Sequence, residues 1–264
     1  MSIQDLYLRT LRGSLTRTLF MPLGQARDNR SKGLDWPGAG DAETMIGDER
    51  MDNIRELATL VLRDGIPGDF VECGVWRGGA TIFMQGILKA YGEHTNRQVW
   101  VCDSFEGCPE PSPEQYPADR EDPHHTFKFL AVSRDEVEAN FHRYGLMDRN
   151  VRFVKGFFKD TLPHQDMRQI ALLRADGDMY ESQTQILEAL YPLMAPGGVV
   201  IIDDYYNIAG SHKAVDDYRA RRRVKGDLNR VDWCAAWWRV PGVLANTPIG
   251  SLDRGLVEPA GASA

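Results

Sequence analysis

Acidic residues follow two apolar segments of the chain that are typical of buried strands. Asp176 and Asp178 come directly after one such run, and Asp203 and Asp204 follow the next. The spacing between Asp176 and Asp203 is that of one strand–helix–strand step, so both strand ends should lie side by side. Carboxylates gathered there repel one another unless they are protonated or paired. A divalent cation would resolve this, and oxygen-only ligands favour Mg²⁺, Mn²⁺ or Ca²⁺ over zinc. The alternative is that Asp203 and Asp204 cap a loop and Asp178 begins a helix.

A glycine-rich turn and a further acid follow two earlier apolar runs. Residues 72–79 are Glu-Cys-Gly-Val-Trp-Arg-Gly-Gly, and Asp103 ends the run at 99–102. A tight glycine turn that leads into a helix N-terminus lets a ligand approach the backbone, although a purely structural turn would also account for the glycines. A carboxylate at the end of the next strand can accept hydrogen bonds from ribose hydroxyls. Because Glu72 would repel a pyrophosphate, cationic S-adenosylmethionine fits this site better than NAD.

These residues need parallel strands that end at one edge of a sheet. Short apolar runs alternate with segments of helical periodicity from Met51 onward. We expect strands at 70–71, 99–102, 151–154, 170–175 and 199–202, and helices at 52–64, 82–90, 133–144, 180–190 and 211–223, with Asp52 and Ser133 as caps of the first and third helices. This alternation predicts a doubly wound, mostly parallel sheet with helices on both faces. The Trp-rich run 231–240 has no intervening helix, which predicts an antiparallel hairpin at the edge.

The segments around this pattern differ from it in composition. Residues 1–24 alternate arginines with leucines, which favours a helix that packs on its own domain or on a partner subunit, with a targeting peptide or membrane-surface helix as the alternative. Residues 104–130 contain five prolines and two histidines, and an irregular insert of this length is typical of a lid or substrate loop. The expected organisation is an N-terminal arm or lid (1–50), an α/β domain (51–245) and a C-terminal tail (246–264).

Composition argues against several classes of function. Thirty-one Lys and Arg face 38 Asp and Glu, and the net charge of −7 disfavours binding to nucleic acid or to anionic membranes. No apolar run is long enough to span a bilayer, and no secretory signal is visible. The four cysteines form no CxxC pair and the histidines lack zinc-type spacing. We therefore expect a cytoplasmic protein with buried, reduced thiols and no nucleic-acid or membrane partner.

Several blocks of sequence together resemble the macrocin O-methyltransferase (TylF-type) family. They are Gly68–Ala80 (GDFVECGVWRGGA), Asp103–Gly107 (DSFEG), Lys155–Pro163 (KGFFKDTLP), Asp176–Ser182 (DGDMYES), Asp203–Tyr205 (DDY) and Lys213–Arg219 (KAVDDYR). The resemblance extends from about residue 44 to residue 240. It implies a class I methyltransferase fold, which is Rossmann-like, with a seven-stranded sheet and an antiparallel C-terminal edge hairpin. The domain at 51–245 would then bind S-adenosylmethionine.

The resemblance also implies roles for individual residues. The implied cofactor-binding residues are Glu72 and Gly74 at the methionine end, Trp76 in the same turn, Asp103 and Ser104 at the ribose, Gly156, Phe158 and Asp160 around the adenine, and Thr44 and Met45 over the cofactor. The implied metal ligands are Asp176, Asp203 and Asp204, with Asp178 as a support or helix-start residue.

Members of this family methylate deoxysugar hydroxyls of glycosylated antibiotics with S-adenosylmethionine and Mg²⁺. The resemblance therefore implies a small-molecule glycoside as acceptor, the 4-hydroxyl of an aminocoumarin noviose first and a macrolide sugar next. A homodimer is plausible from the N-terminal arm and the Trp-rich edge. Methyl transfer is an in-line displacement, in which placement of the reactants supplies much of the rate. Asp176, beside the metal, is the expected base that deprotonates the hydroxyl, with His212 or His125 as alternatives.

Three other functions stay open at this point. Methylation of a catechol-type phenol would use the same metal chemistry. A metal-dependent glycosyltransferase would use Asp176-Gly177-Asp178 as its nucleotide motif but leaves the glycine turn and Asp103 without a role. A nucleoside-binding module with a structural cation would bind the cofactor without turnover.

Overall fold

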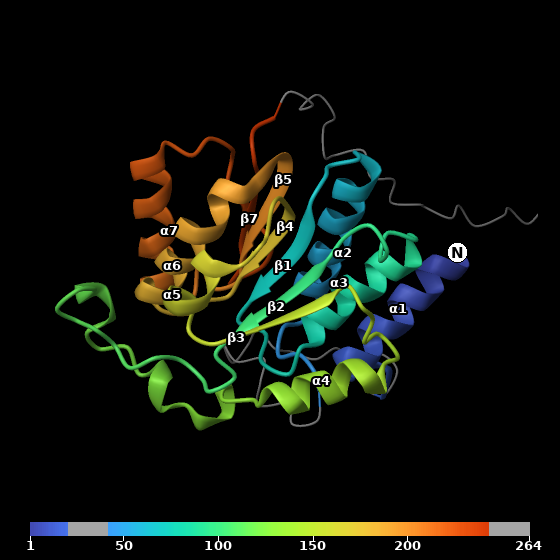
Figure 1. Ribbon diagram of the computed structural model, residues 1–264, viewed down its shortest axis with the longest axis horizontal. Coiled ribbons are helices and arrows are strands. Elements are labelled where there is room, and N and C mark those ends of the chain that lie inside the picture. The colour runs from blue at the N-terminus through green and yellow to red at the C-terminus, as the bar shows by residue number, and fades with distance from the viewer. Residues whose placement is uncertain (21–41, 243–264) are drawn as a thin grey trace, which may run out of the picture.

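A seven-stranded sheet forms the centre of the protein (Figure 1). The computed structural model describes residues 1–20 and 42–242. Strand order is β3-β2-β1-β4-β5-β7-β6. The parallel strands are β1 (Asp69–Cys73), β2 (Val99–Asp103), β3 (Val151–Lys155), β4 (Ile170–Ala175) and β5 (Met194–Ile202), and the antiparallel edge consists of β6 (Asn229–Arg230) and β7 (Ala236–Arg239). The predicted fold class, with its edge hairpin, is confirmed. Because the order reverses between β1 and β4, a ligand site is expected at their carboxyl ends.

Helices cover both faces of the sheet. One face carries α1 (Ile3–Leu15), α2 (Asp48–Arg63), α3 (Gly79–Ala90) and α4 (Arg134–Arg143), and the other carries α5 (Phe158–Thr161), α6 (Tyr180–Leu190) and α7 (Ala209–Arg222). Short 3₁₀ turns are η1 (Thr18–Phe20), η3 (Pro117–Asp119), η4 (His124–Thr126), η5 (Lys128–Leu130), η6 (Leu162–His164) and η7 (Tyr191–Leu193). Alternate side chains of β2 point to opposite faces, so Val101 joins one core and Cys102 the other.

The first helix packs against the domain. Leu8, Leu11 and Leu15 of α1 are buried in the core that α1 shares with α3. Gly86 of α3 permits this contact, because a Cβ at that position would overlap the side chain of Leu11. Among the described residues, no helix combines the length and apolar character that a membrane span requires. The expected tail, residues 246–264, lies outside the described residues, as do residues 21–41 of the expected arm.

The predicted N-caps of two helices, Ser133 and Asp52, have different outcomes in the structure. Ser133 is the N-cap of α4 as predicted, and its hydroxyl accepts a hydrogen bond from the N–H of Glu136 at 3.2 Å. The predicted cap at Asp52 is wrong, because α2 begins at Asp48 with Gly47 at the N-cap. Asp52 instead lies within α2 and forms an ion pair with Arg12 of α1. The ion pair with Arg12 therefore accounts for Asp52, which the sequence pattern alone marks as a helix cap.

Candidate active site

A pocket lies where the carboxyl ends of β1, β2, β4 and β5 meet. Each strand contributes residues from its last position or from the loop that follows it, namely Gly74 and Trp76, Asp103 and Ser104, Asp176 to Asp178, and Asp203 with Asp204. Segments from outside the sheet complete the wall with Met45 and Arg50, with His124, Phe127 and Phe129 of the insert, with Phe157 and Phe158, and with Trp233. The glycine turn and the acidic residues predicted from the sequence thus share one cavity.

The turn after β1 is fixed by its contact with the loop after β4. Gly74 has φ +83°, and a Cβ there would overlap the carbonyl oxygen of Asp176. Only glycine fits, because it tolerates this backbone conformation and has no side chain to clash. Trp76 also has a positive φ, and its indole N–H donates to the carbonyl of Phe129 at 2.9 Å. The turn therefore contacts both the carboxylate loop and the insert.

Asp103 connects the turn after β1 with the loop after β2. Its carboxylate accepts hydrogen bonds from the backbone N–H groups of Val75 and Phe105, both at 2.7 Å. Burial raises the pKa of Asp103, and the backbone hydrogen bonds oppose that rise. Asp103 lines the pocket with its neighbour Ser104, which is where an acceptor for ribose hydroxyls is needed.

The remaining cofactor predictions divide into two groups. Met45 and Phe158 line the pocket together with the four residues just described. The residues outside its wall are Glu72, Thr44, Gly156 and Asp160. Thr44 is buried, and its hydroxyl accepts the N–H of Ile46 at 3.3 Å. Gly156, at φ +137°, donates its N–H to the carbonyl of Asp103 at 2.9 Å. Gly156 thus contacts the pocket residue Asp103, while Thr44 fixes the backbone on either side of Met45.

Glu72 is buried and does not belong to the pocket wall. Only 1% of its surface is exposed, and its carboxylate accepts hydrogen bonds from Arg174 at 2.6 Å and from the Thr81 hydroxyl. Burial raises the pKa of Glu72, while Arg174 acts in the opposite direction. In the structure Glu72 holds Arg174, and the contact with the methionine end of the cofactor that the resemblance implied stays a prediction.

Three carboxylates converge beyond β4 and β5. Asp176, Asp178 and Asp204 each present an oxygen, and these oxygens lie within 4.8 Å of one another. Burial and the charge of Asp176 raise the pKa of Asp178 to about 7. Burial and the charges of Asp203 and Asp178 raise the pKa of Asp204 to about 7. Ionised carboxylates at this distance require a positive partner, and three oxygen donors at the pocket wall fit a hard divalent cation.

This group differs from the predicted ligand set in one member. Asp203 was expected to be a ligand, but one of its oxygens accepts a hydrogen bond from Arg50 at 2.6 Å and the other pairs with Arg174. Burial acts to raise the pKa of Asp203, but the two guanidinium groups outweigh burial and lower it. Asp178, expected to be a support, is the third member of the cluster, and its backbone is left-handed with φ +51°.

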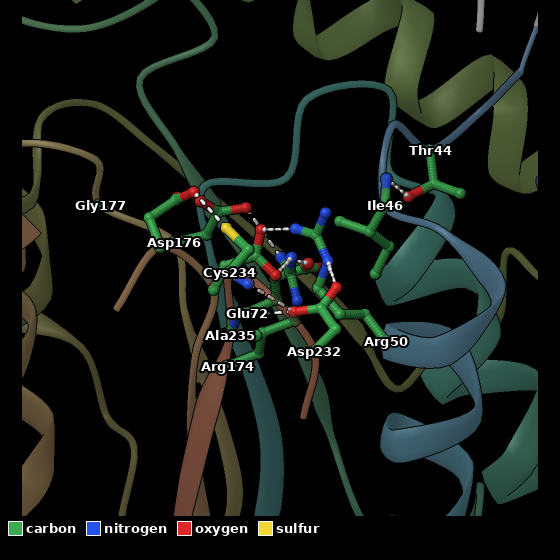
Figure 2. A network of polar contacts seen from close by, with 12 residues as sticks. Thr44, Ile46, Arg50, Glu72, Arg174, Asp176, Gly177, Asp232, Cys234 and Ala235 are labelled. Carbon is green, nitrogen blue, oxygen red and sulfur yellow. Dashed lines mark hydrogen bonds and ion pairs between the residues drawn. The ribbon is translucent and has the colours of Figure 1, made fainter. Parts of the chain in front are cut away.

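Arg174 is a site residue that the sequence analysis missed. It lies in β4 with 2% of its surface exposed and contacts Glu72 at 2.6 Å and Asp176 at 3.0 Å (Figure 2). It also pairs with Asp203. Its position within the otherwise apolar run 170–175 could have indicated this role, because a buried cation needs acidic partners nearby.

Only one histidine among the three near the site faces the pocket. His124 of the insert lines it, and its Nδ1 lies 2.7 Å from Asp122. Burial acts to lower the pKa of His124, but the hydrogen bond to Asp122 and the charge of Asp178 raise it to about 9. His125 is absent from the pocket wall, and the ring of His212 stacks on Tyr205 with centroids 4.4 Å apart. The sequence could not distinguish adjacent His124 and His125.

The insert is attached to the N-terminus of α6. Asp119 is fully buried, and its two carboxylate oxygens accept the N–H groups of Tyr180 at 2.7 Å and Glu181 at 2.8 Å. A carboxylate at a helix N-terminus satisfies free N–H groups and complements the helix dipole. This contact places His124, Phe127 and Phe129 beside the pocket.

The strand order reverses between β1 and β4. The glycine turn and Asp103 follow β1 and β2, and the carboxylate cluster follows β4 and β5. This arrangement is that of a class I methyltransferase. The family model described as Macrocin-O-methyltransferase (TylF) matches residues 5–240, and the chain belongs to this family. It is therefore an O-methyltransferase, and family membership implies S-adenosylmethionine as its methyl donor. The glycosyltransferase and the non-catalytic nucleoside-binding module are thereby excluded.

Relatives and a solved structure agree with this membership. The chain is 46% identical over 246 residues, 89% of this chain and 93% of the relative, to 8-demethyl-8-(2,3-dimethoxy-alpha-L-rhamnosyl)-tetracenomycin-C 4'-O-methyltransferase of Streptomyces olivaceus. It is 46% identical over 211 residues, 80% of this chain and 79% of the relative, to demethyldecarbamoylnovobiocin O-methyltransferase of Streptomyces niveus. The structure of the O-methyltransferase NovP matches with a TM-score of 0.83 and 41% identity, covering 90% of this chain and 99% of that chain.

Proposed function

We propose that this enzyme transfers the methyl group of S-adenosylmethionine to a hydroxyl of a deoxysugar carried by a small-molecule glycoside, with Mg²⁺ at the carboxylate cluster. The observation that supports this function best is that Asp176, Asp178 and Asp204 share a pocket with Gly74 and Asp103. An aminocoumarin noviose 4-hydroxyl is the favoured acceptor and a macrolide sugar the next, because the relatives are named for a tetracenomycin glycoside, a novobiocin precursor and mycinamicin III.

The residues divide the reaction between binding and proton transfer. Asp103 and Ser104 bind the ribose, and Gly74 lets the cofactor approach the turn after β1. Bound Mg²⁺ would lower the pKa of sugar hydroxyls that contact it. Asp176 and Asp204 hold the cation in this proposal.

Asp178 is the base that takes the proton from the acceptor hydroxyl. One oxygen of Asp176, the base expected from the sequence, already accepts a hydrogen bond from Arg174 at 3.0 Å. Asp178 lines the pocket beside Asp176 and accepts a hydrogen bond from the Cys108 thiol at 3.5 Å, so its carboxylate can reach a hydroxyl bound at the cation.

The insert would orient the acceptor. Phe127 and Phe129 stack with ring centroids 5.7 Å apart, and both line the pocket beside His124. Such a wall suits the apolar aglycone of a glycoside while the sugar faces the carboxylates. We also propose that the enzyme forms a homodimer, because Ile3, Leu6 and Phe20 expose apolar side chains that a second copy would cover. A cytoplasmic location is proposed from the reduced cysteines expected from the sequence.

Calorimetric titration of S-adenosylhomocysteine, with and without Mg²⁺, tests the cofactor half of this proposal. Micromolar binding is the expected result, and absence of binding in both conditions would contradict it. Mass spectrometry of reactions with desmethyl aminocoumarin and macrolide glycosides then tests the acceptor. A gain of one methyl group that requires Mg²⁺ is expected, and EDTA should abolish it. Methylation of a simple catechol but of no glycoside would assign the enzyme to phenols instead.

A further inference from the structure

Arg50 connects the N-terminal side of the pocket with its far side. It belongs to the first turns of α2, which begins directly after residues 42–47. That segment borders the pocket through Met45 and lies between α1 and α3, because Glu43 donates its N–H to Leu15 at 3.1 Å and accepts the N–H of Gly79 at 2.8 Å.

The Arg50 guanidinium is buried between acids from two other elements. It donates to Asp203, which follows β5, at 2.6 Å. It also pairs with Asp232, which precedes β7, at 3.1 Å (Figure 2). Only 7% of Arg50 is exposed, and it lies 5.9 Å from the ring centroid of Trp233. A planar guanidinium can hold two carboxylates in fixed geometry, which an ammonium group cannot do.

Both acids are themselves part of the pocket's architecture. Asp232 accepts the N–H groups of Cys234 and Ala235, each at 2.8 Å, and the Cys234 thiol lies 3.2 Å from an oxygen of Asp204. Asp203 is the neighbour of Asp204 in the chain. The positive charge of Arg50 therefore lies next to the carboxylate cluster, while its backbone belongs to the helix that follows residues 42–47.

We propose that Arg50 is a positioning residue with two separable effects, and this rests on the proposed function where it names the cofactor and the cation. Its two-sided bridge to Asp203 and Asp232 holds residues 42–47 over the pocket and so retains the cofactor. Its positive charge lowers the affinity of the site formed by Asp176 and Asp204 for a divalent cation. Removing Arg50 then changes the two affinities in opposite directions, which a general loss of structure would not do.

Arg50→Met and Arg50→Lys separate the two effects. Arg50→Met removes the bridge and the charge, so we expect S-adenosylhomocysteine to bind about fivefold more weakly and Mn²⁺ about fivefold more tightly. Arg50→Lys keeps the charge but loses the two-sided bridge, so we expect weaker S-adenosylhomocysteine binding with unchanged Mn²⁺ affinity. Arg63→Met is the matched control, because Arg63 lies in the last turn of the same helix with 47% of its side chain exposed.

The measurements are calorimetry with S-adenosylhomocysteine, electron paramagnetic resonance titration with Mn²⁺, and hydrogen exchange of residues 42–50 without ligand. Faster exchange of this segment in both Arg50 variants, and not in Arg63→Met, is expected. Parallel weakening of both ligands in Arg50→Met would overturn the charge effect. If Arg50→Lys shows the hydrogen exchange and cofactor affinity of the wild type, the proposed role of the bridge is wrong. If Arg50→Met does not fold, Arg50→Lys alone tests that role. Failure of the wild type to bind S-adenosylhomocysteine would contradict the proposed function, while exchange and Mn²⁺ affinity would still decide the role of Arg50.

Discussion

Replacing Arg174 with methionine should destabilise the protein strongly at neutral pH. Arg174 is 2% exposed and is in contact with Glu72, which is 1% exposed, and with Asp203 and Asp176. Removing one partner from a buried ion pair leaves an uncompensated charge and costs about 3–5 kcal/mol. Since a protein of this size loses about 2–4 °C in Tm per kcal/mol, the expected decrease is roughly 6–20 °C.

The pH dependence of this loss distinguishes a charge effect from a packing defect. Burial already raises the pKa of Glu72, and removal of Arg174 takes away the cation that opposes this. A carboxyl group whose pKa is higher in the folded state stabilises the fold when it is protonated, and that contribution disappears as the pH rises through the folded pKa. The difference in unfolding free energy between wild type and Arg174→Met should therefore shrink as the pH falls from 8 toward 5.

Urea unfolding at several pH values provides the measurement. Glu72→Gln combined with Arg174→Met should recover part of the stability at pH 8, because it removes the stranded charge. A loss below about 1 kcal/mol, or an equal loss at pH 5 and pH 8, would refute the argument that Arg174 compensates buried carboxylates.

Three further changes test the rest of the site. Gly74→Ala should weaken S-adenosylhomocysteine binding at least about tenfold in calorimetry, because the Cβ would displace the loop at Asp176; unchanged affinity would show that the loop moves freely. Asp178→Asn should lower kcat about 100-fold or more with cofactor affinity retained, whereas Asp176→Asn should mainly weaken Mn²⁺ binding; the reverse pattern in steady-state kinetics and Mn²⁺ titration would restore Asp176 as the base. Asp119→Asn should cost about 1 kcal/mol and make residues 104–130 sensitive to limited proteolysis, because the N-terminus of α6 loses its charged acceptor; an intact insert at equal protease exposure would argue against this attachment.

Much of the fold could be predicted because the local pattern and the tertiary environment agree. The strand at 170–175 and the helix at 180–190 have the bounds that periodicity indicates, and the Trp-rich segment pairs antiparallel to β5 as expected. The strand at 199–202 is longer in the structure, where β5 begins at Met194. Pro196 and two glycines in that stretch obscure the strand pattern, since neither residue type favours strands.

The sequence could not predict those contacts of the site that join residues far apart in the chain. The sequence located the strand-end acids, but it could not show that Asp203 faces Arg50, which lies on a helix before the first strand. The same holds for Asp119. Its partners, at the start of α6, come after β3 and β4 in the sequence, so no local pattern connects them with Asp119. Such pairings depend on how the chain returns to the same edge of the sheet, and residue spacing alone does not encode that.

The position of Arg174 explains how four neighbouring aspartates can have different roles. Its register partner on β1 is Glu72, so the two side chains lie on the same face of adjacent strands. From there Arg174 reaches Asp203, where it and Arg50 lower the pKa, so Asp203 stays ionised and occupied by guanidinium groups. Asp178 and Asp204 lack such strong compensation, and burial raises the pKa of each to about 7. In the proposed reaction Asp204 then holds the cation and Asp178 accepts the proton. An apolar residue in place of Arg174 would weaken this distinction, because Arg50 alone would then compensate the charge of Asp203.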